Sequence, residues 1–165
     1  MGERPLDHVL RHNTWANGAL IEFCRSLDPA MHASAVSPGT YGTIEGTLHH
    51  LIGAEQWYTH LLTGDLIGPC LRRDGPPPAI DVLAEVAAGT GNRILSVAET
   101  DDPARRIKLN EGRTSTVGVI LAQLVHHGNE HRTQITTILG ANGIEPPPLS
   151  AWAYGRAAGY SEAEE

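Results

Sequence analysis

Two histidines four positions apart, His127 and His131, are the residues whose type and spacing most directly suggest chemistry. They lie within a long segment of helical periodicity, and positions i and i+4 of a helix stack on the same face. Two imidazoles placed in this way can bind one metal ion together. Because two ligands do not complete a metal site, another element of the fold must supply a third.

The adjacent histidines of an earlier segment, His49 and His50, occupy different faces of a predicted helix. At about 100° per residue, His49 groups with the polar positions of that segment, whereas His50 groups with its apolar neighbours. We therefore predict that His49 faces solvent and that His50 faces inward, as the candidate third ligand. Three neutral imidazoles can hold zinc at about 2.0–2.1 Å and leave one coordination position open, as catalytic zinc sites do.

A purely structural role for these histidines is the alternative, because a buried imidazole can be stabilised by hydrogen-bond partners in the core. Other familiar chemistries find little support. Gly128 follows His127, so the HExxH pattern of metalloproteases is absent, and the chain has no GxSxG, P-loop or GxGxxG motif. Cys24 and Cys70 form no CxxC pair and are predicted to be unreactive, reduced thiols.

Length and composition predict one soluble domain over residues 1–165, with 41% apolar residues. No segment approaches the roughly 18 consecutive apolar residues of a membrane span, and the N-terminus lacks a signal-peptide pattern. With only two cysteines, a cytoplasmic location is expected. The net charge of −7, from 12 basic and 19 acidic residues, argues against nucleic-acid binding.

The elements that must position the histidines are four predicted helices. Proline and glycine signals end them, and Thr43 is a predicted N-cap of the second. In the third, Gly89-Thr90-Gly91 predicts lost stability, a local bend or close packing. The predicted helices cover about Leu6–Leu27, Thr43–Leu62, Ile80–Thr100 and Thr116 or Val117 to Leu139.

The segments between these helices carry turn signals. Two short runs around Asn110-Glu111-Gly112 predict a small hairpin that packs on the bundle. The tail is predicted to form a short helical turn around Trp152 and Tyr154. Residues 31–42 are a predicted loop, residues 66–79 a stiff proline-rich connection, and residues 161–165 a disordered end. The predicted fold is therefore an all-α four-helix bundle with a small β-hairpin before the last helix.

Several polar residues fall on or near the apolar faces of these helices. Asn13 and Asn17 lie on the apolar stripe of the first helix and are predicted to tie it to its neighbours. Glu55 lies among leucines and isoleucine of the second helix, where a carboxylate either bonds to another helix, which we favour, or supports a site. His8 falls off the apolar stripe of its helix and is predicted to be a surface residue.

Three stretches and the tail together resemble the DinB/YfiT-like superfamily of four-helix-bundle proteins. The first is His-Asn-Thr-Trp-Ala-Asn at 12–17, similar to an aromatic-Asn-x-Trp-Ala-Asn pattern. The second, 48–57, resembles a helix in which a ligand histidine leads into Ala-Glu and then an aromatic residue. The third, 127–135, resembles His-Gly-x-x-His-Arg-Gly-Gln-Ile. Two positions depart from the pattern, with His12 at an aromatic position and Thr133 at a glycine position.

The resemblance implies that His50, His127 and His131 bind zinc, nickel or another divalent ion within an up-down-down-up bundle that is often a homodimer. Family members of known activity use the metal to activate a low-molecular-weight thiol, in S-transfer or thiol-dependent isomerisation. The residues expected to support the ligands or line the pocket are Asn13, Glu55, Arg132 and His12.

Three hypotheses follow for the function. The first is a metal-dependent transferase or hydrolase that activates a thiol or water to attack a small-molecule substrate. The second is a non-catalytic, metal-binding stress-response bundle that acts as a dimer. The third is a helical core without a metal. The sequence does not distinguish among the metals, because affinity of a given site rises along the same metal series whatever its role.

Overall fold

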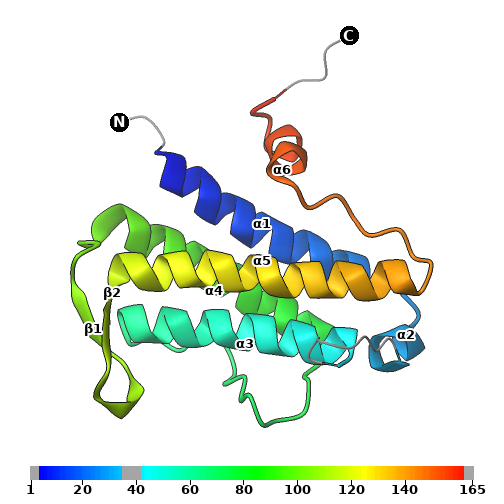
Figure 1. Ribbon diagram of the computed structural model, residues 1–165, viewed down its shortest axis with the longest axis horizontal. Coiled ribbons are helices and arrows are strands. Elements are labelled where there is room, and N and C mark those ends of the chain that lie inside the picture. Colours follow the sequence, from blue (N-terminus) through cyan, green and yellow to red (C-terminus); the bar gives the residue numbers. More distant parts are fainter. Residues whose placement is uncertain (1–3, 35–41, 162–165) are drawn as a thin grey trace.

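The structure, a computed structural model, describes residues 4–34 and 42–161. Long helices form a bundle, and a two-stranded hairpin precedes the last of them (Figure 1). This architecture confirms the predicted all-α bundle with its hairpin. The elements are α1 (Pro5–Arg25), α2 (Pro29–Ser34), α3 (Ile44–Thr63), α4 (Ile80–Thr100), β1 (Arg106–Lys108), η1 (Asn110–Gly112), β2 (Thr114–Thr116), α5 (Val117–Ala141) and α6 (Ala151–Ala157).

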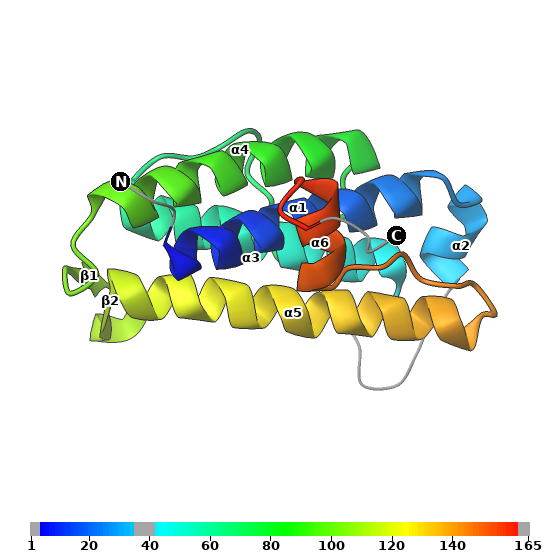
Figure 2. The same cartoon turned by 90° about the horizontal axis from the view of Figure 1, so that it is seen from above.

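The four long helices are arranged up-down-down-up. In Figures 1 and 2, α1 and α5 run in one direction along the bundle, whereas α3 and α4 run in the other. Because α3 and α4 are parallel, the chain between them must return along the whole bundle. A helix of 20 residues such as α3 is about 30 Å long, and an extended chain of the connection's length can span about 50 Å. The proline-rich segment 64–79 makes this return.

The helix boundaries follow from capping. The Thr43 hydroxyl accepts a hydrogen bond from the backbone N–H of Gly46 at 3.1 Å, which confirms the predicted N-cap of α3. Gly64 ends α3 with a positive φ of 79°, a conformation that glycine adopts without strain. The Thr116 hydroxyl caps α5 in the same way, at 3.4 Å from the N–H of Val119.

Two predicted boundaries were wrong in detail. The first helix ends at Arg25. The short helix α2 begins at Pro29, because proline is well suited to the first helical position, and it extends into the predicted loop as far as Ser34. Helix α5 continues through Gly140 to Ala141, and Gly143, with a φ of 72°, follows its end. The short tail helix α6 confirms the predicted turn around Trp152 and Tyr154. Residues 35–41 of the predicted loop and 162–165 of the predicted disordered end lie outside the described residues.

The core consists of two apolar clusters with a polar layer between them. Leu20, Ile52 and Ile135 belong to one cluster. Leu10 and Leu124 belong to the other, where Ile107 of the hairpin is also buried, so the hairpin packs on the bundle as predicted. Along α1, α3 and α5, most of the buried polar residues fall between these two clusters. They include Asn13, Asn17, Glu55, His127, His131 and Arg132.

The prediction that His49 faces solvent was wrong, because the connection 64–79 packs on the polar side of α3. Gln56 docks the connection there. Its side-chain amide donates to the carbonyls of Ile67 and Pro69 at 2.6 and 2.8 Å and accepts from the N–H of Leu71 at 2.9 Å. His49 lies on the same side of α3 and is only 6% exposed. Among the described residues, no helix is both long and apolar enough to cross a membrane.

The glycines of α4 serve close packing rather than a bend, since α4 is one uninterrupted helix. A Cβ atom on Gly91 would lie 2.2 Å from the side chain of Thr14 in α1, and one on Gly89 would lie 2.5 Å from Ile67 of the connection. Helices α1 and α4 therefore approach each other at a point where only glycine fits.

Gly91→Ala is expected to lower the free energy of unfolding by about 1–3 kcal/mol, because the added methyl overpacks the contact with Thr14. The matched control is Gly18→Ala in the interior of α1, where a Cβ atom has nothing within 4 Å. There alanine should raise stability by about 0.5–1 kcal/mol through its higher helix propensity. Urea denaturation of both variants would measure the difference. Equal effects at the two positions would contradict the close-packing explanation.

Candidate metal centre

The structure brings His50 of α3 together with His127 and His131 of α5, and one ligand atom from each lies within 4.8 Å of the others. The Nε2 atoms of His127 and His50 are 3.2 Å apart, and those of His127 and His131 are 3.0 Å apart. His127 and His131 are 9% and 4% exposed, and His50 is half-buried. The three rings thus meet in the polar layer between the two apolar clusters.

These separations match those of ligands on one metal ion. Nitrogens about 2.05 Å from a shared ion lie about 2.9 Å apart at right angles and about 3.3 Å apart at tetrahedral angles. Both measured Nε2–Nε2 separations, 3.2 and 3.0 Å, fall within this interval. A three-histidine set with these spacings fits zinc or another imidazole-binding divalent ion.

The proton positions also favour a shared cation. The Nδ1 atom of His131 lies 2.7 Å from the side-chain oxygen of Gln134, which can only accept, so Nδ1 carries the proton and Nε2 presents a lone pair. His127 Nε2 faces both other Nε2 atoms, and a proton there can bond to only one of them. Hydrogen bonding alone therefore cannot satisfy both close nitrogen pairs, whereas one cation between the three lone pairs can.

Burial keeps two of these imidazoles neutral. It lowers the pKa of His50 to about 4, and the nearby His131 and Arg73 side chains act in the same direction. Burial likewise lowers the pKa of His127 to about 4, with smaller contributions from His131 and His50. Because metals bind the neutral imidazole, protons do not compete for these two ligands at neutral pH.

The metal-free chain is expected to lose stability as the pH falls from 7.5 to 5. The pKa values of His50 and His127 are lower in the folded chain than the ordinary 6.5, so below about pH 6.5 the unfolded chain binds more protons. The loss begins there and continues until the pH reaches the folded pKa of about 4. His50 is only half-buried, and with solvent screening we expect a loss of about 1–2 kcal/mol by pH 5.

Urea denaturation at both pH values would measure this loss. The double variant His50→Ala/His127→Ala should show a smaller pH-dependent loss than the unmodified chain. His60→Ala, which removes an exposed histidine of α3, should leave the loss unchanged. A double variant with the full loss would contradict the assignment to these two rings.

A buried hydrogen-bond network links α1 to α3 and α5, the helices that carry the three histidines. Glu55 Oε1 accepts from the side-chain amides of Asn13 and Asn17 of α1, at 2.7 and 2.8 Å. Arg132 of α5 donates to the amide oxygens of the same two asparagines, the first at 2.8 Å. The predicted tie between α1 and its neighbours is confirmed, as is the interhelical bond of Glu55. The network fixes α1, α3 and α5 relative to one another.

Gly128 makes room for this network. A Cβ atom there would lie 2.4 Å from Asn13 Oδ1 and 2.9 Å from the Arg132 guanidinium. His12 lies elsewhere, at the contact between α1 and the tail. Its Nε2 is 2.8 Å from the carbonyl oxygen of Leu149, and its ring packs near Trp15 and Tyr154. His8 is partly exposed and contacts the edge of the Tyr160 ring.

A cavity of about 490 Å³ opens beside the three histidines. His50 and His127 form part of its wall. The sequence pattern does not predict most of the other lining residues. It also does not single out Gln134, although a polar residue three positions after His131 on the same helix face could have been recognised as a hydrogen-bond partner for it. The other lining residues are His49, Gly53, Ala54, Trp57, Tyr58, Leu71, Arg73 and Asn110.

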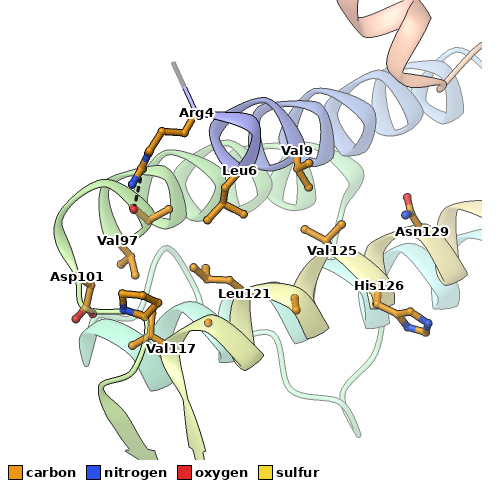
Figure 3. Close-up of a pocket in the computed structure, with 14 residues that line it drawn as sticks. Arg4, Leu6, Val9, Val97, Asp101, Val117, Leu121, Val125, His126 and Asn129 are labelled. Atoms are coloured by element: carbon orange, nitrogen blue, oxygen red, sulfur yellow. Dashed lines mark hydrogen bonds between the residues drawn. The ribbon is translucent and has the colours of Figure 1, made fainter. Parts of the chain in front are cut away.

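A separate cavity of about 500 Å³ lies between α1, the end of α4 and the first half of α5 (Figure 3). Its wall is mainly apolar, and Leu6, Val9 and Leu121 point into it, whereas the ring of His126 points away. None of the three clustered histidines lines it. The chemistry-bearing cavity is therefore the one between α3, the connection and the hairpin.

Comparison with known proteins agrees with this geometry. A sequence model of the DinB family matches residues 1–165. A search of curated proteins finds no match. The family match spans the whole chain, including all three helices of the polar layer and the three clustered histidines. The chain belongs to the DinB family.

Proposed function

We propose that this DinB protein is a metal-dependent enzyme that activates a thiol or a water molecule beside His50, His127 and His131. The observation that carries the proposal is the convergence of three imidazole nitrogens, 3.0 and 3.2 Å apart, at the wall of a cavity of about 490 Å³. A structural metal site would be closed by four protein ligands. A three-ligand group beside a cavity of this size instead favours a site that a small molecule enters.

The chain's own residues have distinct tasks in this proposal. His50 and His127 are neutral at physiological pH and so present lone pairs. Gln134 holds His131 with Nε2 directed at the other two rings. The ring of Tyr58 meets the His127 ring edge-on, at 5.9 Å between centroids, and lines the cavity beside it. A divalent ion such as zinc or nickel, when bound, would supply a Lewis acid that lowers the pKa of a thiol or water.

The reaction class we propose is transfer to or from a low-molecular-weight thiol, with hydrolysis as the water-based counterpart. Both need an ionised nucleophile at neutral pH and a small electrophilic substrate in the same cavity. The DinB family match supports this class. The resemblance to that family implies thiol-dependent chemistry, because family members of known activity use a low-molecular-weight thiol.

Two measurements on the native, untagged chain test the proposal. Elemental analysis should find close to one divalent ion per chain. The cobalt-substituted chain should then change its visible spectrum when a panel of low-molecular-weight thiols is added. A chain that binds no ion would refute the proposal. A bound ion with no response to any thiol, and no turnover with an electrophile panel, would favour the non-catalytic metal-binding role.

Homodimer formation and a cytoplasmic location, which the family resemblance and the cysteine content led us to expect, stay predictions. Sedimentation of the metal-loaded chain at several concentrations would test the first. The proposed chemistry does not depend on either, since the three histidines and the cavity all come from one chain.

A further inference from the structure

The cavity beside the three histidines has an electrostatic character opposite to that of the whole chain. The chain carries 19 acidic and 12 basic residues. Among the described residues that line the cavity there is no carboxylate, but there is one guanidinium, that of Arg73. An adjoining cavity of about 290 Å³ shares Trp57, Tyr58 and Asn110 with it, also lacks a described carboxylate, and is lined by Arg113. The described lining of both cavities therefore favours an anion.

Arg73 is free to bind a ligand, unlike its neighbour Arg72. The Arg72 guanidinium forms two hydrogen bonds to Asp74, at 3.2 and 3.1 Å, on the outer surface. Arg73 makes no ion pair with any carboxylate in the part of the chain that the structure describes. A cation without an internal partner, placed at a cavity that holds two candidate metal ligands, is available to recognise a charged group on a bound molecule.

The rest of the wall suits an apolar or aromatic body. Trp57 is 41% exposed, a large indole surface left accessible at the cavity. Leu71 of the connection, together with Gly53 and Ala54 of α3, completes this apolar side. Gly53 matters for the shape, because a Cβ atom there would lie 3.2 Å from the carbonyl oxygen of Leu71. The connection can therefore lie close against α3 and bring Arg73 to the cavity.

We propose that the substrate is a small molecule with a carboxylate that Arg73 binds and an apolar or aromatic body that packs on Trp57. This inference deepens the proposed function and rests on it for the role of the three histidines. The guanidinium fork matches the two oxygens of a carboxylate. A cavity of about 490 Å³ lies within the range of roughly 300–1,000 Å³ that is usual for small-molecule sites.

The test compares two probes of the same shape, 3-phenylpropanoate and 3-phenylpropanamide. Each is titrated by calorimetry into the zinc-loaded full-length chain at pH 7.5. We expect the carboxylate to bind at least about tenfold more tightly than the amide, because charge-assisted hydrogen bonds exceed neutral ones. This preference should fall to near unity in Arg73→Gln. It should persist in Arg72→Gln, the matched control that removes the neighbouring charge from the outer surface.

A second variant separates Arg73 from a bound metal, which also attracts carboxylates. His131→Ala removes a candidate ligand that does not line the cavity. The carboxylate preference should survive in this variant, whether or not it binds zinc. A preference that vanishes in His131→Ala but persists in Arg73→Gln would overturn the proposal, as would equal binding of the two probes to the unmodified chain. Failure of the proposed function would show differently, as a native chain without a bound ion.

Discussion

His131→Ala is expected to abolish stable metal binding. Its Nε2 atom lies 3.0 Å from that of His127, and its ring is 4% exposed. Among the described residues, the only group of three or more possible metal ligands is His50, His127 and His131, so the site has no replacement for His131. Only His50 and His127 would remain, and two imidazoles do not hold a divalent ion against competition from a buffer chelator. Loss of a residue that merely supports a ligand typically costs about 10–100-fold in affinity, and loss of the ligand should cost more.

Elemental analysis after dialysis against a weak chelator would measure the loss, with circular dichroism to confirm that the helices persist. His126→Ala is the matched control, because this neighbouring histidine is exposed and lies outside the cluster. It should retain one ion per chain. Gln134→Ala should fall between the two, with an affinity loss of about 10–100-fold, because His131 would lose its orienting acceptor. Full metal content in His131→Ala would remove this histidine from the site.

The cluster of three histidines could be predicted because all of them lie on long helices. The helical period places His127 and His131 on one face, and the apolar neighbours of His50 place it inward. Assigning the inward faces of two helices was therefore enough to select three residues, and the structure groups the same three. The interhelical role of Asn13 and Glu55 could be predicted for the same reason, since a polar residue on a buried stripe requires a partner on another helix.

The environment of the cluster could not be predicted, because it depends on segments without periodicity. The return connection 64–79 docks through Gln56. It lies on the same side of α3 as His49, which is buried and lines a cavity together with Leu71 and Arg73 of the connection. Periodicity alone assigned that side to solvent. In the same connection, Arg73 lines the cavity whereas Arg72 pairs with Asp74. The connection has no helical or strand periodicity from which to predict which of the two side chains faces the cavity. Loop docking is a tertiary property, and only the structure reveals it.

The second large effect is expected on stability, when Arg132 is removed from the buried network that it forms with Glu55, Asn13 and Asn17. Arg132→Met is expected to lower the free energy of unfolding by about 3–5 kcal/mol, because Glu55 would keep its buried charge without a nearby cation. The two asparagines would also lose the donor to their amide oxygens. Urea denaturation of the metal-free chain would measure the loss. The matched control is Arg72→Met, which removes an exposed arginine and should change stability by less than about 1 kcal/mol.

The double variant Arg132→Met/Glu55→Gln should recover part of that loss, because glutamine keeps the acceptor for both asparagines and removes the uncompensated charge.

The pH dependence of the stability of Arg132→Met gives an independent check. Burial already raises the pKa of Glu55 above its ordinary value, and the charge of Arg132 opposes this effect. Without Arg132 the pKa should rise further, so the folded variant takes up a proton more readily than the unfolded chain does. Its stability deficit relative to the unmodified chain should therefore shrink as the pH falls from 7 toward 5. A deficit that stays constant over this range would show that lost packing, rather than the unpaired Glu55 charge, causes the destabilisation.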